Sequence, residues 1–330
     1  MKINKNECED YLYCIEAKIG AGSGGTVYKA WHARLQKYVV IKETPSEYET
    51  LNRYFKRCLS GAIETPCIEA DALKNVKSPY LPQVYDIIEE SGHVYTIMEY
   101  IEGESFDKLL ERGRRFAQAE IVKWYSQLAS ALRIIHEQDV CHRDIKPANI
   151  MLTLDGDICL IDFNAAIVSG KSARFISRSP GYASPEQNEI FERIEHSRHE
   201  NDRICHYRNK PTQSDMGNKT ELSSDDPLHP IVWPESMRKR IMNTKDTQPA
   251  DSIDWKRSDI YSLGATMYHI LTEKRPQERA SEIISISKLG YFDAELTRII
   301  EKSMQPEPSD RFASASELAT SIRSLNAIRG

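Results

Sequence analysis

The sequence lacks any long apolar run. No stretch approaches the roughly 18 apolar residues that a membrane-spanning helix requires, and the first 13 residues lack the apolar core of a secretory signal peptide. An excess of basic charge, which would favour nucleic acid or an anionic membrane surface, is absent as well, because the formal net charge is -5. We therefore expect a soluble, cytoplasmic protein with neither nucleic acid nor membrane as a partner.

C-x-x-C pairs are also missing. The seven cysteines are an odd number and lie scattered along the chain, so we expect reduced thiols, several of them buried as small apolar side chains. His196, His199, Cys205 and His206 lie close together, but their spacing matches no common structural zinc pattern. We therefore favour a solvated polar segment over a zinc site there.

The first hundred residues have mainly the pattern of β-strands. Residues 11–42 alternate in short runs around a glycine cluster, which predicts three strands of a meander. Residues 84–100 predict a hairpin that turns near Ser91 and Gly92. Residues 47–77 have helical spacing, so one helix is expected beside these antiparallel strands.

The pattern changes to helices near residues 101–104, and 40% hydrophobic residues in 330 suffice for one large or two modest cores. The run at 259–272 is apolar nearly all round, as in a helix buried in a core. Residues 187–254 are polar with little periodicity, which is typical of a loop or disordered segment. We predict an α+β fold with a small antiparallel sheet lobe (1–100) and a larger, mainly helical lobe (101–330) that carries the 187–254 insertion. The expected helices cover residues 106–113, 119–138, 259–272, 294–305 and 314–327.

Gly20, Gly22 and Gly25 form a G-x-G-x-x-G pattern. Nucleotide-binding Rossmann domains share this spacing, but there the third glycine opens a helix, whereas here a strand-like run follows. A strand–loop–strand flap over phosphates fits better, since glycines let the backbone approach anionic oxygens. Taken alone, the pattern leaves an ordinary glycine hairpin open.

Charged residues gather at three further places. Lys42 ends an apolar run, where a buried lysine is costly unless paired; Glu69 is a candidate partner, and a surface lysine is the alternative. Asp162 ends another apolar run and can ligate a hard cation. Between them, residues 141–152 hold a dense polar group that phosphoryl transfer can use, with a carboxylate for the hydroxyl, a cation for the phosphoryl group and an oxygen ligand for Mg²⁺. That group consists of His142, Arg143, Asp144, Lys146 and Asn149.

The sequence resembles the eukaryotic-type protein kinase family in five features that follow one another in the same order. These are the glycine loop, the strand lysine, H-R-D-x-K-x-x-N, Asp162-Phe163 and the Ser-Pro-Glu at 184–186. The resemblance covers about residues 11–325, and the stretch 181–187 most resembles the bacterial serine/threonine branch. It implies a bilobal kinase fold, ATP in the cleft, Mg²⁺ as cofactor, and transfer of the γ-phosphate to serine or threonine hydroxyls of a protein substrate.

The resemblance also implies roles for the matching positions. Lys42 would bind the α- and β-phosphates and pair with Glu69. Asp144 would orient the substrate hydroxyl, and Lys146 would neutralise the γ-phosphate. The same resemblance assigns Mg²⁺ to Asn149 and Asp162, support of Asp144 and Lys146 to Ser179, and the adenine slot to Val27, Val40, Met98, Glu99, Ile101 and Met151.

Three structural residues follow from the same resemblance. Glu186 would pair with Arg311 in the helical lobe, and Asp259 would brace the backbone of the catalytic loop. Asp259 lies 73 residues after Glu186, where the family spacing is about a dozen, so roughly 60 residues are inserted beside the expected substrate groove. A docking arm for a partner, a regulatory flap and a tolerated surface insertion all remain open.

Asn164 replaces the glycine of Asp-Phe-Gly. Asparagine tolerates a positive φ best among non-glycine residues, so it can preserve the turn; a slower or inactive enzyme is the alternative. Arg143 often docks a phosphorylated activation loop in the family, so we expect autophosphorylation at Ser172 or Ser177, unless the loop orders without phosphate. A pseudokinase scaffold that binds nucleotide without turnover and a small-molecule kinase of the same fold are the rival functions.

Overall fold

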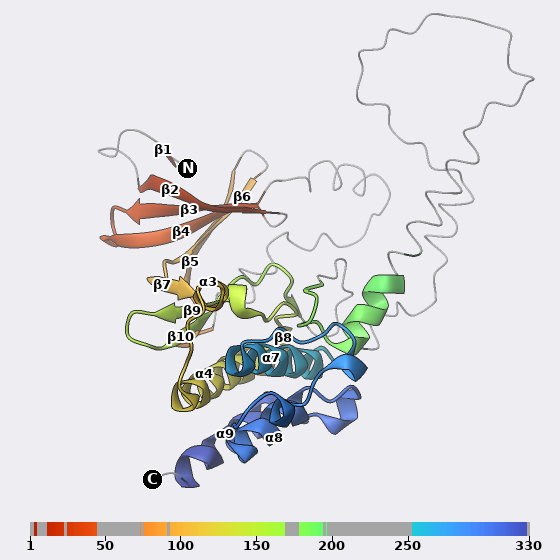
Figure 1. Cartoon of the computed structure of the whole chain (residues 1–330). Helices are drawn as coiled ribbons and strands as arrows, with labels where there is room; N and C mark the ends of the chain where they lie inside the picture. The colour runs from red at the N-terminus through yellow and green to blue at the C-terminus, as the bar shows by residue number, and fades with distance from the viewer. Residues whose placement is uncertain are drawn as a thin grey trace, which may run out of the picture.

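The computed structural model describes residues 3–4, 12–22, 25–44, 73, 76–90, 93–168, 178–193, 196 and 253–328. A small lobe built on a β-sheet lies against a larger lobe of helices (Figure 1). The predicted α+β fold with two lobes is confirmed. No helix within these ranges is both long and apolar enough to cross a membrane.

The small lobe is a six-stranded sheet in the order β1-β2-β3-β4-β6-β5. Strands β2, β3 and β4 pair antiparallel in sequence, which confirms the predicted meander. Strands β5 and β6 form the predicted hairpin, with Glu90 opposite His93. The strands are β1 (Ile3–Asn4), β2 (Tyr13–Gly22), β3 (Gly25–His32), β4 (Lys37–Thr44), β5 (Val84–Glu90) and β6 (His93–Glu99).

One face of this sheet carries its own apolar core, to which alternate residues of β4 contribute Val39 and Ile41. Ala30 and Ile97 from the neighbouring strands pack against them. Of the helix predicted over 47–77, the structure describes Leu73, which is helical and 1% exposed, and Val76. The rest of that helix, including Glu69, lies outside the described residues.

The five predicted helices of the large lobe are confirmed. Helix α7 is buried along most of its length, as its all-round apolar sequence predicted, and it packs against α4 and α8 (Figure 1). Helix α4 also packs against α9. The helices are α3 (Phe106–Glu111), α4 (Gln118–Glu137), α7 (Trp255–Thr272), α8 (Ala294–Ser303) and α9 (Ala315–Ile328), with 3-10 turns η1 (Pro147–Asn149), η3 (Ala280–Glu282), η4 (Ile286–Lys288) and η5 (Pro308–Asp310).

Five very short strands frame the polar segments. The apolar run that precedes Asp162 predicted one of them, and the sequence pattern did not predict the other four. One sheet joins β7 (Gly103–Ser105), β9 (Ile150–Thr153) and β10 (Ile158–Leu160), and a second pairs β8 (Val140–Cys141) with β11 (Ile167–Val168). The polar run at 142–149, which is the expected catalytic loop, therefore connects β8 to β9. The Asp-Phe-Asn segment at 162–164 lies between β10 and β11.

The predicted loop at 187–254 is wrong at its start, because residues 185–193 are helical. Ile190 on this helix is 5% exposed and packs with Trp255, Cys141 and Ile167. That packing stabilises a helix that sequence polarity concealed. The expectation of reduced cysteines is wrong for Cys14, which is disulfide-bonded.

The predicted ion pair of the helical lobe is confirmed. The guanidinium of Arg311 makes two parallel bonds to Glu186, of 2.7 Å and 2.8 Å, and its side chain has no exposed surface. It therefore ties the start of the 185–193 helix to η5.

Candidate active site

Asp144, Lys146 and Ser179 form a closed hydrogen-bonded cluster. The ammonium of Lys146 donates to Asp144 Oδ2 at 2.7 Å and to Ser179 Oγ at 3.0 Å. The hydroxyl of Ser179 donates to Asp144 Oδ1 at 2.6 Å. The carboxylate thus has a fixed orientation beside a cation, which is the arrangement that a hydroxyl-orienting base needs.

Asn149 lies behind this cluster at the end of η1. Its amide nitrogen donates to the carbonyl oxygen of Asp144 at 2.8 Å and to Asp144 Oδ2 at 3.2 Å. Both bonds use the nitrogen, so the amide oxygen is the atom suited to a hard cation such as Mg²⁺.

Lys42 reaches across from the sheet lobe to Asp162. Its ammonium lies 3.3 Å from Asp162 Oδ1, and the lysine is 4% exposed while the Asp162 side chain is 37% exposed. The buried cation is therefore paired, and the carboxylate stays accessible to a ligand. The proposed partner Glu69 lies outside the described part of the chain.

The turn that follows Asp162 differs from the expectation for Asn164. The left-handed backbone is at Asp162, with a φ of 65°, whereas Asn164 is not among the residues with a positive φ. Asparagine at 164 is therefore not needed for its tolerance of the left-handed region.

His142 connects the catalytic loop with this turn. Its ring lies 4.5 Å from that of Phe163, and it is fully buried. Nδ1 accepts from the Asp144 amide at 3.3 Å, so the proton of a neutral ring sits on Nε2, which lies 3.2 Å from the carbonyl oxygen of Ile161. Sequence reasoning noted His142 only as part of a polar run and missed this link.

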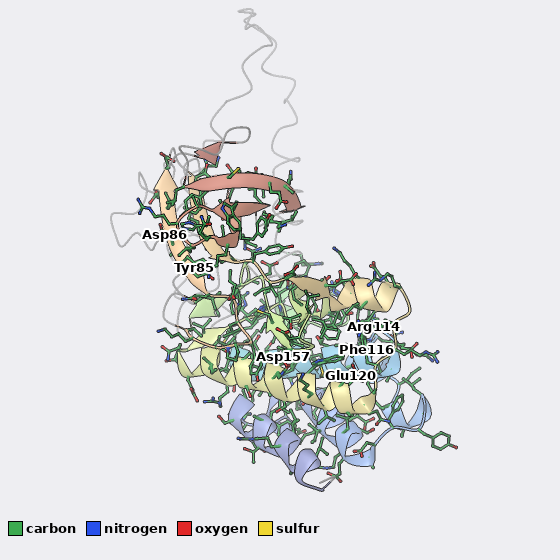
Figure 2. All side chains as sticks on the ribbon, turned by 90° about the vertical axis from the view of Figure 1, so that its left-hand side faces the viewer. Tyr85, Asp86, Arg114, Phe116, Glu120 and Asp157 are labelled. Carbon is green, nitrogen blue, oxygen red and sulfur yellow. The ribbon has the colours of Figure 1, made fainter. Side chains whose placement is uncertain are left out.

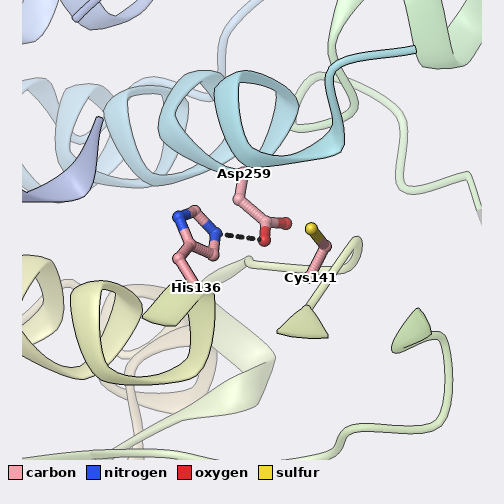
Figure 3. Close-up of side chains that lie close together, drawn as sticks. All are labelled: His136, Cys141 and Asp259. Atoms are coloured by element: carbon pink, nitrogen blue, oxygen red, sulfur yellow. Dashed lines mark hydrogen bonds and ion pairs between the residues drawn. The ribbon is translucent and has the colours of Figure 1, made fainter. Parts of the chain in front are cut away.

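Asp259 braces the start of the catalytic loop, as predicted. Its carboxylate accepts from the amides of His142 at 2.8 Å and Arg143 at 2.7 Å, and it lies 3.0 Å from His136 Nε2. Figure 3 shows His136 pointing at this carboxylate, with the sulfur of Cys141 nearby. The three ligand-type side chains lie within 4.8 Å of one another, but the carboxylate oxygens are already engaged in hydrogen bonds, so the cluster is a structural brace.

The glycine pattern forms a turn between two strands. Gly20 and Gly22 lie in β2, and Gly25 opens β3 opposite Gly22. Gly25 has a φ of 115°, and a Cβ there would lie 2.1 Å from the carbonyl oxygen of Glu43. A strand rather than a helix follows Gly25, which excludes the Rossmann alternative.

The residues expected around adenine lie on both lobes. Val40 is opposite Met98 in the β4–β6 pair, and Val27 is opposite Lys42 in β3–β4. Met98 is 8% exposed and belongs to the core of the large lobe. Glu99 ends β6 and precedes Ile101 in the connection to the helical lobe, while Met151 lies in β9.

A cavity of about 540 Å³ opens beside the Asp144 cluster. Residues 178–182, which we call the substrate loop because the resemblance places a protein substrate beside them, bend at Gly181, which has a φ of 79°. Arg275 donates to the carbonyl oxygen of Pro180 at 2.9 Å. Asp107 Oδ1 is buried without a hydrogen-bond partner. The lining is mixed in charge, and Figure 2 shows one of its residues, Arg114, near Phe116 and Glu120. The lining residues are Asp107, Leu110, Glu111, Gly113, Arg114, Lys146, Pro147, Ala148, Ser179, Pro180, Tyr182, His269, Glu273 and Arg275.

Tyr182 anchors the substrate loop to helix α7 through a 2.6 Å bond to His269 Nδ1. Burial raises the pKa of Tyr182 to about 12, and burial together with the charge of Arg275 lowers the pKa of His269 to about 4. At neutral pH the phenol therefore donates to a neutral imidazole. Neither residue was found from the sequence, because 87 positions separate them.

This pair predicts a loss of stability in acid. His269 has a lower pKa folded than unfolded, so its contribution is complete above about pH 6.5 and is lost as the pH falls toward 4. Between pH 7 and 4.5, the wild type should lose about 1–2 kcal/mol more free energy of unfolding than His269→Gln, after allowance for partial exposure. Urea unfolding at both pH values measures this. Equal losses in the two proteins would contradict the assignment.

Comparison with known proteins agrees with this geometry. The protein kinase domain model matches residues 13–200, more than half of the chain. The chain therefore belongs to the protein kinase family. A probable serine/threonine-protein kinase of Clostridium acetobutylicum is 32% identical over 53% of the chain, PknL of Mycobacterium tuberculosis (strain H37Rv) 33% over 54%, and mouse Nek1 34% over 51%. The matched part makes up 26%, 44% and 14% of those proteins, respectively.

Proposed function

We propose that this chain is a protein serine/threonine kinase, which transfers the γ-phosphate of ATP to serine or threonine hydroxyls of a protein with Mg²⁺ as cofactor. The observation that carries the proposal is the cluster of Asp144, Lys146 and Ser179. Its carboxylate is oriented by two donors, and its cation is held beside it. Similarity to named serine/threonine kinases supports the same conclusion.

In this proposal, Asp144 orients the substrate hydroxyl and accepts its proton, while Lys146 neutralises charge on the transferred group. Ser179 keeps both side chains in place from the substrate loop. Lysine at 146 is the serine/threonine form of this position in the family; tyrosine kinases typically differ there.

The donor set fits a nucleotide with Mg²⁺. Asn149 and Asp162 offer the oxygen atoms that Mg²⁺ prefers, and the exposure of Asp162 leaves its carboxylate accessible. Lys42 supplies a buried cation for the α- and β-phosphates, and we expect Glu69 to fix it. Bound Mg²⁺ would neutralise charge on the phosphates. Gly20, Gly22 and Gly25 carry no Cβ, so the backbone around them can approach phosphate oxygens closely.

The adenine ring is proposed to lie between the lobes that residues 1–100 and 101–330 form. Val27, Val40 and Met151 would supply apolar faces, and Met98 would close the back of the slot. The peptide groups of Glu99 and Ile101, together with Gly20 and Gly22 near the phosphates, would complete the site.

A protein segment is proposed to bind in the cavity beside Asp144. Lys146 and Ser179 of the Asp144 cluster line this cavity, so a segment bound there would lie next to the carboxylate that is proposed to orient its hydroxyl. A docking partner for residues 187–254 and autophosphorylation at Ser172 or Ser177 belong to the same proposal. These positions, except 187–193, 196 and 253–254, lie outside the described ranges.

The test is incubation of the purified chain with labelled ATP, Mg²⁺ and a generic protein substrate, beside Asp144→Asn as inactive control. Label on substrate serine or threonine, absent without Mg²⁺ and in the variant, is the expected result. Mass spectrometry should find phosphate on Ser172 or Ser177. Calorimetric binding of Mg·ATP with no transfer to any protein would instead favour the pseudokinase, and transfer to small molecules alone would favour the small-molecule kinase.

A further inference from the structure

The two ends of the insertion meet at the start of the catalytic loop. Helical residues 185–193 lead into the insertion, and Trp255 begins α7 directly after it. Ile190 and Trp255 pack with Cys141 of β8 and Ile167 of β11. This group, which we call the flank cluster, thus contacts both strands that carry the catalytic loop and the Asp-Phe-Asn turn.

Arg143, the residue before Asp144, contacts Asp259, Gln187 and Trp255 in the described part of the chain. Its amide donates to Asp259 Oδ1 at 2.7 Å, and its carbonyl oxygen accepts from Gln187 Nε2 at 3.0 Å. Its guanidinium lies 4.3 Å from the centroid of the Trp255 ring. Gln187 is the first residue of the insertion and Trp255 follows its last residue, so contacts from both ends of the insertion meet at Arg143.

The contact with Trp255 favours the buried position of the Arg143 side chain. Arg143 is 2% exposed, and burial lowers its pKa to about 10, so it still carries its charge at neutral pH. A buried guanidinium is costly without favourable electrostatic contacts, and the face of tryptophan is the best aromatic surface for a cation. The indole ring therefore stabilises Arg143 in its buried position.

The contact with Trp255 also favours the backbone conformation of Arg143. Its φ is 66°, in the left-handed region that is unfavourable for a residue with a Cβ. Such a conformation persists only where the surrounding contacts determine it. If the guanidinium moved away from Trp255, the backbone could relax, and the direction of the next side chain, Asp144, would change with it.

We propose that Trp255 is a positioning residue for Asp144, acting through the guanidinium of Arg143, and that it couples the catalytic loop to the flanks of the insertion. The proposal rests on the proposed kinase function. Gln187 assists by fixing the Arg143 carbonyl. Within the described part of the chain, Trp255 makes no hydrogen bond or ring contact with Asp144, Lys146 or Ser179. Its effect on the reaction therefore passes through Arg143.

The experiment compares Trp255→Leu, which removes the aromatic face, with Trp255→Phe, which keeps one. Ile190→Ala is the matched control, because it opens a cavity in the flank cluster but keeps the Trp255 ring. The kinetics are measured under conditions in which all variants are folded. We expect Trp255→Leu to lower kcat at least tenfold with KM for ATP within twofold, Trp255→Phe to stay within threefold of wild type, and Ile190→Ala to stay within twofold.

A double-mutant cycle tests the route through Arg143. In an Arg143→Leu background, Trp255→Leu should lower kcat less than threefold further, because the side chain through which it acts is gone. Equal kcat losses in Trp255→Leu and Ile190→Ala, or an undiminished effect of Trp255→Leu in the Arg143→Leu background, would reduce Trp255 to a packing residue.

A readout without activity separates this inference from the kinase function. Amide hydrogen exchange over residues 141–146 should be faster in Trp255→Leu than in wild type and in Ile190→Ala. If wild type transfers no phosphate while the exchange differs as expected, the proposed function fails and the positioning role stands. Unchanged exchange in Trp255→Leu overturns the positioning role whatever the activity.

Discussion

Replacement of Asp144 by asparagine should lower kcat for phosphoryl transfer by about three orders of magnitude, within the range that loss of a positioned acid–base group causes. Asparagine keeps the size of the side chain but cannot accept the proton of the substrate hydroxyl. It also removes the charge that Lys146 and Ser179 contact at 2.7 Å and 2.6 Å. The KM for ATP should change little, because the proposed phosphate ligands Lys42 and Asp162 remain.

Steady-state kinetics with a protein substrate measure this effect. Asp157→Asn is a suitable control, because Asp157, labelled in Figure 2, is a carboxylate of the same lobe whose side chain contacts Lys123 and Gln127 rather than Lys146 and Ser179. Its kcat should stay within twofold of wild type. A loss of less than tenfold in Asp144→Asn would show that Asp144 is not the group that receives the proton.

Replacement of Arg311 by leucine should lower the free energy of unfolding by about 3–5 kcal/mol, as expected when one partner of a buried ion pair is removed. Arg311 donates to both carboxylate oxygens of Glu186 and to the carbonyl oxygens of Gln305, Pro306 and Arg257. Leucine would leave these acceptors without their donor in a place where the arginine side chain is fully buried.

Urea denaturation followed by circular dichroism measures this loss. Arg298→Leu removes an exposed partner of Glu295 and should cost less than about 1 kcal/mol. The double variant Glu186→Gln/Arg311→Met should lose less stability than Arg311→Leu, because no charge is then left unpaired. If Arg311→Leu and Arg298→Leu cost the same, the buried pair contributes no more than a surface pair.

The sequence by itself determined the lobes, because their signals are local. The strands around Gly20 and Gly25 alternate with period two, and the run that became α7 is apolar on all sides. The polar run from His142 to Asn149 was equally visible, since its residues are neighbours in the chain. Local pattern did not indicate the ion pair of Glu186 with Arg311 or the contact of Asp259 with the catalytic loop. Both were predicted from the family resemblance.

Tertiary structure alone decided the contacts between distant segments. Tyr182 meets His269 across 87 positions, and Trp255 stacks on Arg143 across the whole insertion. The helix at 185–193 and the two- to four-residue strands β8, β9 and β11 form because long-range packing and pairing stabilise them. No periodicity in such short segments can indicate this. Sequence therefore named the groups for phosphoryl transfer, and the fold set their orientation.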